Sequence, residues 1–196
     1  MRVEIIRHGE TALQAEGRYQ GRTDAALSEE GRKKLCPSEK KPKQVFVTSL
    51  LRSRETAEIL FPLAEQLPTR GLEEMDFGIF EGRNYIEMQD DMAYRSWVES
   101  GCLSPCPGGE SKADFCERVC RSFCRLLEEE EQKGREELIL LAHGGTQMAV
   151  MEAFCREKRS YFNWHLGSGK GYLLLAEDWQ KKRELELLGI TDYNRK

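Results

Sequence analysis

The stretch Arg7-His8-Gly9-Glu10-Thr11 directly follows the short apolar run Val3-Glu4-Ile5-Ile6, which predicts a β-strand despite its one acidic residue. A strand that ends in Arg-His-Gly places two polar side chains at the edge of a sheet. In open α/β sheets, ligands bind outside the carboxyl ends of the strands. Gly9 allows a sharp turn there and leaves room for a ligand to approach. The stretch therefore predicts an α/β sheet with a ligand site at its edge.

A second strand with the same ending occurs late in the chain. Residues 138–142, Leu-Ile-Leu-Leu-Ala, form a near-continuous apolar run typical of a buried parallel strand, and His143-Gly144-Gly145-Thr146 follows it. The chain has only 3 His, and two of them occupy these positions. Two structural core histidines would have no reason to repeat this arrangement. We therefore expect His8 and His143 to meet at one site.

Length and charge limit the class of protein. The 196 residues predict a single domain, 1–196, long enough to bury a substantial core. The net charge of -4 argues against a nucleic-acid-binding or membrane-surface protein, which would show a basic excess. No apolar run reaches the length of a transmembrane helix, and no signal peptide precedes the first strand. The sequence therefore predicts a cytoplasmic protein with neither nucleic-acid nor membrane partners.

The 7 Cys do not predict a disulfide framework, because their number is odd and no secretion signal accompanies them. Cys116, Cys120 and Cys124 lie at i, i+4 and i+8 on one stripe of a helix, and we interpret them as small core residues. Cys102 and Cys106 flank a proline-containing loop. No second cysteine pair has zinc-site spacing, so no metal site is predicted.

Strands and helices alternate along most of the chain. We expect strands at 2–6, 45–47, 138–142, 172–175 and 185–188, and helices at 28–35, 49–60, 111–132 and 146–155, with further helical pieces within 84–99. Residues 7–27 and 72–82 are expected to form loops. This alternation predicts a three-layer α/β/α sandwich with a largely parallel central sheet.

Arg7, His8, Arg52 and His143 are expected to converge at the carboxyl edge of that sheet. Arg52 lies in the first turn of its helix, where free backbone N–H groups and the positive end of the helix dipole suit an anion. The planar fork of arginine suits phosphate in particular. The chain has no Walker-type loop, no Cys-x5-Arg loop and no Gly-x-Ser-x-Gly elbow, so a histidine is the natural nucleophile. Nearby arginines would keep it neutral, as attack on phosphorus requires.

A phosphate ester with an alkoxide leaving group also needs a proton donor. The acidic segment 72–82 offers Glu73, Glu74, Asp76 and Glu81. The residues alone do not select one of these four carboxylates.

Six blocks of the sequence together resemble the histidine phosphatase superfamily, the phosphoglycerate mutase-like proteins. The blocks are Arg7-His8-Gly9-Glu10-Thr11, Gly21-Arg22-Thr23-Asp24 with Leu27-Ser28-Glu29-Glu30-Gly31, Val47-Thr48-Ser49-Leu50-Leu51-Arg52, Leu72-Glu73-Glu74-Met75-Asp76-Phe77-Gly78, Pro107-Gly108-Gly109-Glu110-Ser111 and His143-Gly144-Gly145. They follow one another in the order of the family. The resemblance implies a phosphoglycerate mutase-like fold.

The resemblance also implies a role for each principal residue. His8 attacks phosphorus and becomes a phosphohistidine, while Arg7, Arg52 and His143 hold the phosphoryl oxygens and stabilise charge. Glu74 is the carboxylate that protonates the leaving oxygen and then activates water. No metal and no cofactor are required, because arginines and histidines supply the positive charge.

The sequence also suggests a role for each of four further residues. Gln14 stands where many relatives have Asn, and we expect it among the phosphate contacts. Arg22 and Thr23 are candidate substrate contacts from the second block. His165 has no motif around it, and we interpret it as structural.

The resemblance leaves the reaction open between phosphatase and mutase. Cofactor-dependent mutases resemble this chain but are longer, with extra basic residues beyond the acid block, whereas residues 75–100 here contain only Arg83 and Arg95 as cations. We therefore expect hydrolysis of a small phosphate monoester. The pattern that includes Phe77-Gly78-Ile79-Phe80-Glu81-Gly82 is similar to α-ribazole phosphatases of cobalamin synthesis, and sugar-phosphate phosphatases share much of it. A phosphoglycerate mutase and a non-catalytic phospho-ligand binding module are the alternatives, and the sequence is compatible with a homodimer.

Overall fold

Six strands form one sheet in the order β3-β2-β4-β1-β5-β6 in the computed structural model, which describes residues 1–195. The strands are β1 (Arg2–Arg7), β2 (Gln44–Val47), β3 (Glu65–Pro68), β4 (Glu137–Ala142), β5 (Lys170–Leu175) and β6 (Glu186–Asp192). The pairs β1–β4, β2–β4 and β2–β3 are parallel, whereas β5 runs antiparallel to both of its neighbours. The predicted largely parallel sheet is therefore confirmed.

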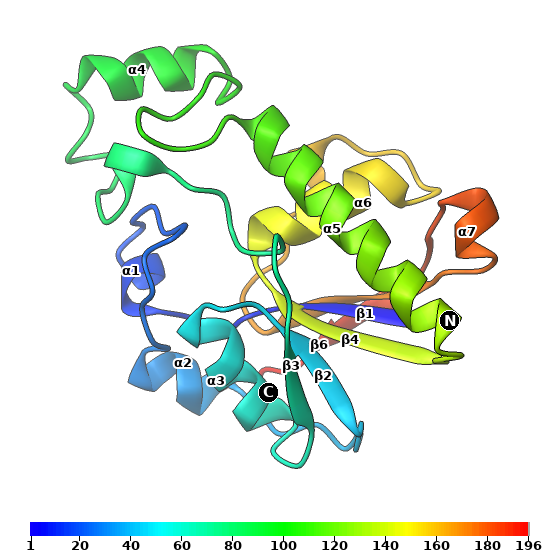
Figure 1. Cartoon of the computed structure of the whole chain (residues 1–196). Helices are drawn as coiled ribbons and strands as arrows, with labels where there is room; N and C mark the ends of the chain where they lie inside the picture. Colours follow the sequence, from blue (N-terminus) through cyan, green and yellow to red (C-terminus); the bar gives the residue numbers. More distant parts are fainter. Residues whose placement is uncertain (196) are drawn as a thin grey trace.

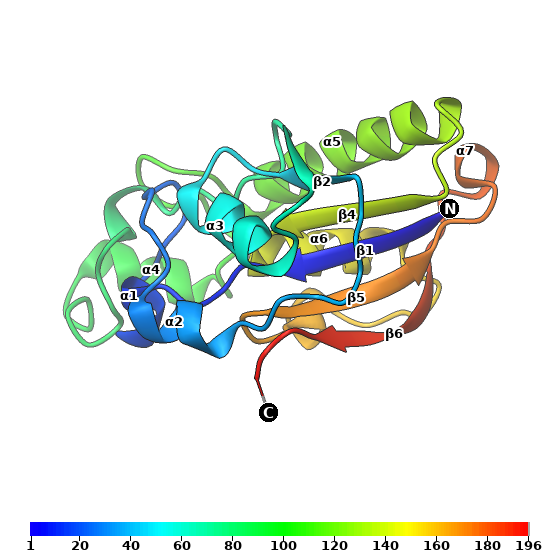
Figure 2. The same cartoon turned by 90° about the horizontal axis from the view of Figure 1, so that it is seen from below.

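Helices cover both faces of this sheet (Figure 1, Figure 2). They are α1 (Ala12–Ala15), α2 (Glu29–Lys34), α3 (Leu51–Leu60), α4 (Met92–Glu99), α5 (Lys112–Gln132), α6 (Gly144–Phe154) and α7 (Trp179–Lys182), with single 3-10 turns at Gly78–Phe80 and Tyr161–Trp164. Two separate apolar cores result. One packs Val3 and Ile5 of β1 against α5 and α6, and the other packs Ile6 and the facing side chains of β2 and β4 against α3.

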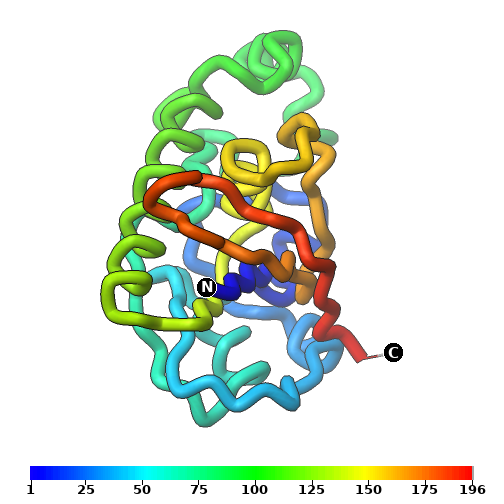
Figure 3. The backbone as a smooth tube through the Cα atoms, turned by 90° about the vertical axis from the view of Figure 1, so that its right-hand side faces the viewer, coloured from blue at the N-terminus to red at the C-terminus, as the bar shows by residue number. Residues whose placement is uncertain are grey.

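The pleat of β1 explains why the two cores are separate. Neighbouring side chains of a strand point to opposite faces, so Ile5 and Ile6 are buried on different sides of the sheet. A central parallel strand that is covered on both faces must be apolar on both. The three-layer α/β/α sandwich expected from the sequence is thus the observed fold. Figure 3 shows the C-terminal strand β6 at the outside of the sheet, beside β5.

Most of the expected elements are present, but the short helix α7 was not expected and three further segments differ. Residues 7–27 contain the short helix α1, which Thr11 caps. Residues 84–99 are helical only from Met92, where the Asp91 carboxylate accepts hydrogen bonds from the backbone N–H groups of Ala93 and Tyr94. The strand β3 was not expected, because Glu-Gln-Leu-Pro has weak strand propensity and pairs only with β2 at the sheet edge.

The cysteines are all free thiols. Cys116, Cys120 and Cys124 are half-buried on α5, and Cys116 and Cys124 pack against the larger core. Burial raises the pKa of the Cys116 thiol to about 11 and that of the Cys120 thiol to about 12. These thiols are therefore neutral at ordinary pH, in agreement with a packing role.

The carboxyl ends of β1 and β4 point toward a layer of loops and short helices that includes α1 and α4 (Figure 1). The long helix α5 begins at this end of the sheet. Ser111 caps its first turn, because the Ser111 hydroxyl accepts a hydrogen bond from the backbone N–H of Asp114 at 3.1 Å. The observed helix agrees with the one expected at 111–132.

Replacing Ser111 with Ala should remove this cap and lower the free energy of unfolding by about 1 kcal/mol. Urea denaturation measures the change. Ser96→Ala, at an exposed position inside α4, is the control and should alter stability much less. Equal effects of the two substitutions would contradict a capping role for Ser111.

Candidate active site

His8 and His143 lie side by side at the carboxyl ends of the neighbouring strands β1 and β4. The backbone N–H of His8 donates to the Ala142 carbonyl at 3.0 Å, and this bond continues the hydrogen-bond ladder between the two strands. The two imidazole rings are edge to face, with centroids 5.2 Å apart, and both are buried. The expected meeting of the two histidines is confirmed.

The protonation of His8 follows from its hydrogen bonds. Nδ1 lies 2.7 Å from the Gly9 carbonyl oxygen, which can only accept, so Nδ1 carries the proton and Nε2 carries the lone pair. Arg52 Nε donates to this Nε2 at 3.2 Å. Burial and the charges of Arg52 and Arg7 hold the pKa of His8 well below its usual range. The side chain is a neutral imidazole whose nucleophilic nitrogen faces a guanidinium.

Arg52 is the second residue of α3, and backbone carbonyls fix its orientation. Nη1 donates to the Thr23 carbonyl at 2.9 Å, and Nη2 donates to the Gly21 carbonyl at 2.8 Å. Only glycine fits at position 21, since a Cβ there would lie 1.8 Å from the Met75 carbonyl oxygen. The loop before α2 thus positions the guanidinium beside His8.

One detail of the expected anion site is wrong. The first N–H group of α3 was expected to be free for an anion, but the Leu51 N–H donates to the Asp24 carboxylate at 2.6 Å. This backbone N–H group is therefore already used by the protein. The Arg52 side chain brings the charge of α3 to the histidines.

Two buried nitrogen atoms at the site have no hydrogen-bond partner among the described residues. They are Arg7 Nε and His143 Nδ1. Buried donors without partners are rare in folded proteins, and a bound oxyanion would satisfy them. Arg7 is otherwise held by Nη1, which donates to the Leu166 carbonyl and contacts His165 Nε2 at 2.9 Å.

The second ring nitrogen of His143 contacts a hydroxyl group. Nε2 lies 2.9 Å from Thr48 Oγ1, and burial followed by the charge of Arg52 lowers the pKa of the ring well below its usual range. When the hydroxyl donates to Nε2, the single proton of the neutral ring lies on Nδ1. His143 then offers a neutral N–H donor beside His8.

Geometry selects one of the four candidate carboxylates. Glu74 accepts hydrogen bonds from the Gly145 N–H at 2.9 Å and from the Met75 N–H at 3.0 Å. Gly145 lies in the first turn of α6, next to His143, so this contact places the Glu74 carboxylate beside the histidine pair. Its charge also acts on Arg7 and Arg52 and opposes the lowering of their pKa by burial.

The other three acids have structural partners. Glu73 accepts from the Gly71 N–H and lies near Arg118, Asp76 accepts from the Gly78 N–H, and Glu81 accepts from the backbone N–H groups of the loop before α2. These bonds hold the acidic segment in place. The choice of Glu74, made from the resemblance alone, agrees with this geometry.

The three residues expected as additional phosphate or substrate contacts instead make hydrogen bonds within the loops around the site. The Gln14 Oε1 atom accepts from the Thr11 N–H at 3.2 Å and completes the capping box of α1, so this oxygen is not free for a ligand. The backbone N–H and the hydroxyl of Thr23 donate to the Glu81 carboxylate, and the backbone N–H of Arg22 donates to the same carboxylate. Thr23 acts on the site through its carbonyl, which holds Arg52.

His165 lies at the site, a position that the sequence did not predict. It was interpreted as structural, but its Nε2 contacts Arg7 and its ring lines the same cavity as Glu74. Burial and the charge of Arg7 lower its pKa, so the ring is predominantly neutral and can accept from the guanidinium. It lies in a loop beyond Trp164 with no motif around it, and its proximity to Arg7 depends on the fold.

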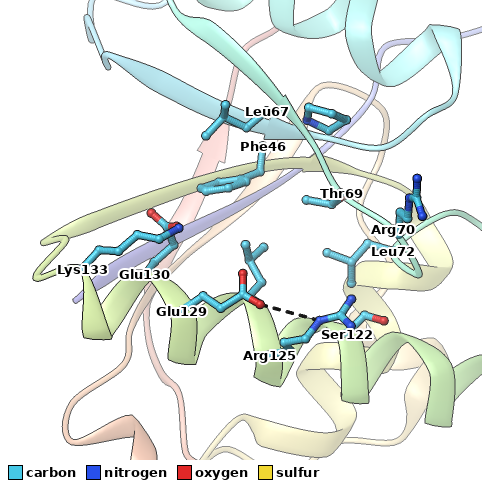
Figure 4. Close-up of a pocket in the computed structure, with 12 residues that line it drawn as sticks. Phe46, Leu67, Thr69, Arg70, Leu72, Ser122, Arg125, Glu129, Glu130 and Lys133 are labelled. Atoms are coloured by element: carbon cyan, nitrogen blue, oxygen red, sulfur yellow. Dashed lines mark hydrogen bonds and ion pairs between the residues drawn. The ribbon is translucent and has the colours of Figure 1, made fainter.

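A cavity of about 260 Å³ opens beside this cluster. Its lining residues are Arg7, Tyr19, Glu74, Met75, Phe77, Trp97, Cys102, Lys112, Gly144, Gly145, Met148, Tyr161, Phe162 and His165. A second cavity, of about 320 Å³, lies between β2, β3 and α5 (Figure 4). Its apolar floor includes Phe46 and Leu67, and none of the site residues lines it. Among residues 1–195, no group of three His, Cys, Asp or Glu side chains could hold a metal ion.

The sequence profile of the histidine phosphatase superfamily (branch 1) matches residues 3–188. The chain belongs to this superfamily. A glucosyl-3-phosphoglycerate phosphatase of Mycobacterium tuberculosis is 29% identical over an alignment 203 residues long, gaps included. The alignment covers 94% of this chain and 89% of that protein. A phosphoglycerate mutase-like protein 4 of Arabidopsis thaliana is 28% identical, with 76% of this chain and 69% of that protein covered.

Solved structures agree with the fold. The α-ribazole phosphatase of Shigella flexneri superposes with a TM-score of 0.79 at 20% identity and covers 100% of this chain and 96% of that one. The Thermus thermophilus protein TTHB049 is 28% identical, with a TM-score of 0.68 and coverage of 100% and 98%. Within residues 1–195, no helix is both long and apolar enough to span a membrane.

The environment of His8 predicts its titration. An exposed imidazole is half-protonated near pH 6.5, but burial and two guanidiniums disfavour the cation of His8. The ring should therefore remain neutral, with the proton on Nδ1, as pH falls through 6.5. NMR of the histidine ring nitrogens, assigned with a His8→Ala variant, measures this. A His8 signal that titrates with an ordinary midpoint would contradict the buried, guanidinium-flanked site.

Proposed function

We propose that the protein is a phosphomonoesterase that transfers the phosphoryl group of a small phosphate ester to His8 and then to water. The observation that carries the proposal is the hydrogen bond between His8 Nδ1 and the Gly9 carbonyl, which leaves Nε2 unprotonated beside Arg52. Membership of the superfamily and the phosphatase named among the relatives support the same reaction. Residues 1–196 form a single histidine phosphatase domain in this proposal.

In the first step, the Nε2 lone pair of His8 attacks phosphorus. The bond from phosphorus to the ester oxygen breaks, and Glu74, in its protonated form, gives a proton to the leaving oxygen. Arg7, Arg52 and the Nδ1–H group of His143 bind the phosphoryl oxygens, where negative charge must be stabilised. The two unpartnered nitrogen atoms of Arg7 and His143 fit this role.

In the second step, water replaces the alcohol. The Glu74 carboxylate takes a proton from the water molecule as it attacks phosphorus, the N–P bond to His8 breaks, and inorganic phosphate leaves. Glu74 is again protonated and His8 is again neutral, so the cycle closes. Gln14, Thr23 and Arg22 support the site through the loop contacts described above, with Gln14 as an additional phosphate contact through its amide N–H group.

Hydrolysis is favoured over phosphoryl shuttling between two hydroxyl groups. The mutase reaction on phosphoglycerate requires cations for a carboxylate and a second phosphate. Of the two cations in residues 75–100, Arg83 pairs with Asp91 at 2.9 Å and Arg95 is exposed, and neither lines the cavity. We take α-ribazole 5′-phosphate or a sugar phosphate as the leading substrate candidates. The cytoplasmic location and the homodimer stay predictions of the sequence.

Phosphate release from a panel of esters tests the proposal. The panel contains α-ribazole 5′-phosphate, a sugar monophosphate, 3-phosphoglycerate and p-nitrophenyl phosphate, each assayed with chelator present. The wild type should release phosphate, and His8→Ala should release none. Isomerisation of 3-phosphoglycerate without net hydrolysis would instead establish a mutase, and inactivity in both assays would favour the binding module.

Replacing Glu74 with Gln should lower the rate of His8 phosphorylation by an alkyl phosphate by about 10²–10⁴, because the alkoxide then leaves without a proton. The loss in this rate should be much smaller for p-nitrophenyl phosphate, whose leaving group needs no proton. Single-turnover quench measurements separate this step from hydrolysis of the phosphohistidine, in which Glu74 also takes part. Glu73→Gln is the matched control, since its carboxylate contacts Gly71 and Arg118. Equal losses for both esters would count against Glu74 as the general acid.

A further inference from the structure

We propose that the cavity lined by Arg7 and Glu74 narrows the candidate substrates named above: it selects phosphate esters whose alcohol carries an apolar ring, in preference to polyol esters such as sugar phosphates and to carboxylate-bearing esters. This inference rests on the proposed phosphatase function, and it concerns the leaving alcohol. Arg7, Glu74 and Gly145 line this cavity, and Arg7 directly precedes the buried His8, so in the proposed function the phosphoryl end of the cavity lies at these residues. The remainder of the cavity therefore receives the alcohol part of the substrate.

Aromatic rings form one wall of this cavity. Tyr19, Phe77 and Trp97 pack against one another, with centroid separations of 5.2 Å for Tyr19–Phe77, 5.7 Å for Tyr19–Trp97 and 6.4 Å for Phe77–Trp97. They come from the loop before α2, the acidic segment and α4, so three distant parts of the chain build one surface. Mutual packing of this kind fixes the rings and presents a preformed apolar surface.

Further apolar residues line the cavity. Tyr161 and Phe162 lie edge to face with centroids 5.1 Å apart, and Met148 of α6 also lines the cavity. An apolar ring that enters this lining would lose contact with water, which is favourable. The volume of about 260 Å³ limits the alcohol to a small group.

The two tyrosine hydroxyls of these walls already have partners, whereas Trp97 Nε1 is buried without one among the described residues. The Tyr19 hydroxyl lies 3.0 Å from the Tyr94 hydroxyl, and the Tyr161 hydroxyl donates to the Gly145 carbonyl at 3.4 Å. Burial raises the pKa of the Cys102 thiol, so this group is neutral. A polyol would bring several hydroxyl groups into a space that offers few partners, and unpaired polar groups are costly to bury.

Lys112 is the cation of the cavity away from the phosphoryl end, and it too has partners. Its Nζ lies 3.6 Å from Glu152 and 4.3 Å from the centre of the Tyr161 ring. The carboxylate and the ring face together compensate its charge. The neutral ring of His165 adds no positive charge. The cavity thus offers no uncompensated cation for a carboxylate or a second phosphate of the substrate.

Three esters of primary alcohols test the inference: 3-phenylpropyl phosphate, glycerol 1-phosphate and 3-phosphoglycerate. Their ester groups are alike, so differences report on the rest of the alcohol. We expect kcat/KM for the phenylpropyl ester to exceed that of the other two by at least about tenfold. Binding of each ester to His8→Ala, measured by calorimetry, should follow the same order.

Phe162→Ala should reduce the preference severalfold, mainly by lowering kcat/KM for the phenylpropyl ester. Phe162 is 59% exposed, so its removal costs little stability. Leu63→Ala is the control, because Leu63 is 83% exposed and lies in the loop after α3, outside this cavity. It should leave the preference unchanged.

The outcomes separate the two proposals. Hydrolysis with glycerol 1-phosphate or 3-phosphoglycerate preferred would overturn the inference and leave the phosphatase function standing. No hydrolysis, but tighter binding of the phenylpropyl ester to His8→Ala, would support the apolar cavity and contradict the phosphatase. No hydrolysis and no preferential binding would overturn both.

Discussion

The hydrogen bond from His8 Nδ1 to the carbonyl of its neighbour Gly9 is the contact on which the chemistry of this site depends. It determines the tautomer, and thereby leaves the lone pair on Nε2. Burial beside two guanidiniums then keeps the ring from taking a second proton. Without the Gly9 carbonyl, the ring could carry its lone pair on either nitrogen. Without the two guanidiniums, the ring would be partly protonated near neutral pH. The turn that follows β1 supplies the carbonyl, whereas the end of β1 and the start of α3 supply the two guanidiniums.

The parallel pairing of β1 with β4 places the other groups around this nitrogen. It aligns Arg7 with Ala142, so the residue after each strand is a histidine at the same edge of the sheet. The helix α6 begins at once after β4, and its Gly145 N–H holds Glu74. A Cβ at position 145 would lie 2.1 Å from the Glu74 carboxylate, so the glycine is required for this close approach. The pairing of β1 with β4 thus brings His8, His143 and the residue that holds Glu74 to one edge of the sheet.

Local sequence signals predicted five of the six strands, the helices α2, α3, α5 and α6, and the four charged or imidazole groups of the centre, because these signals depend on neighbouring residues. The choice of Glu74 needed the resemblance to a family, since four acids in one segment look alike without their partners. His165, Lys112 and the aromatic walls were not predicted. Their positions depend on contacts between distant segments, and a polar edge strand such as β3 has no pattern of its own.

Detection of the phosphorylated enzyme tests the central claim most directly. The protein is mixed with a phosphate ester, quenched within one turnover and examined by phosphorus NMR and peptide mass spectrometry. The account predicts an acid-labile phosphoryl group on Nε2 of His8, absent from His8→Ala. A phosphoryl group on another residue, or hydrolysis with no phosphoenzyme at any time, would contradict it.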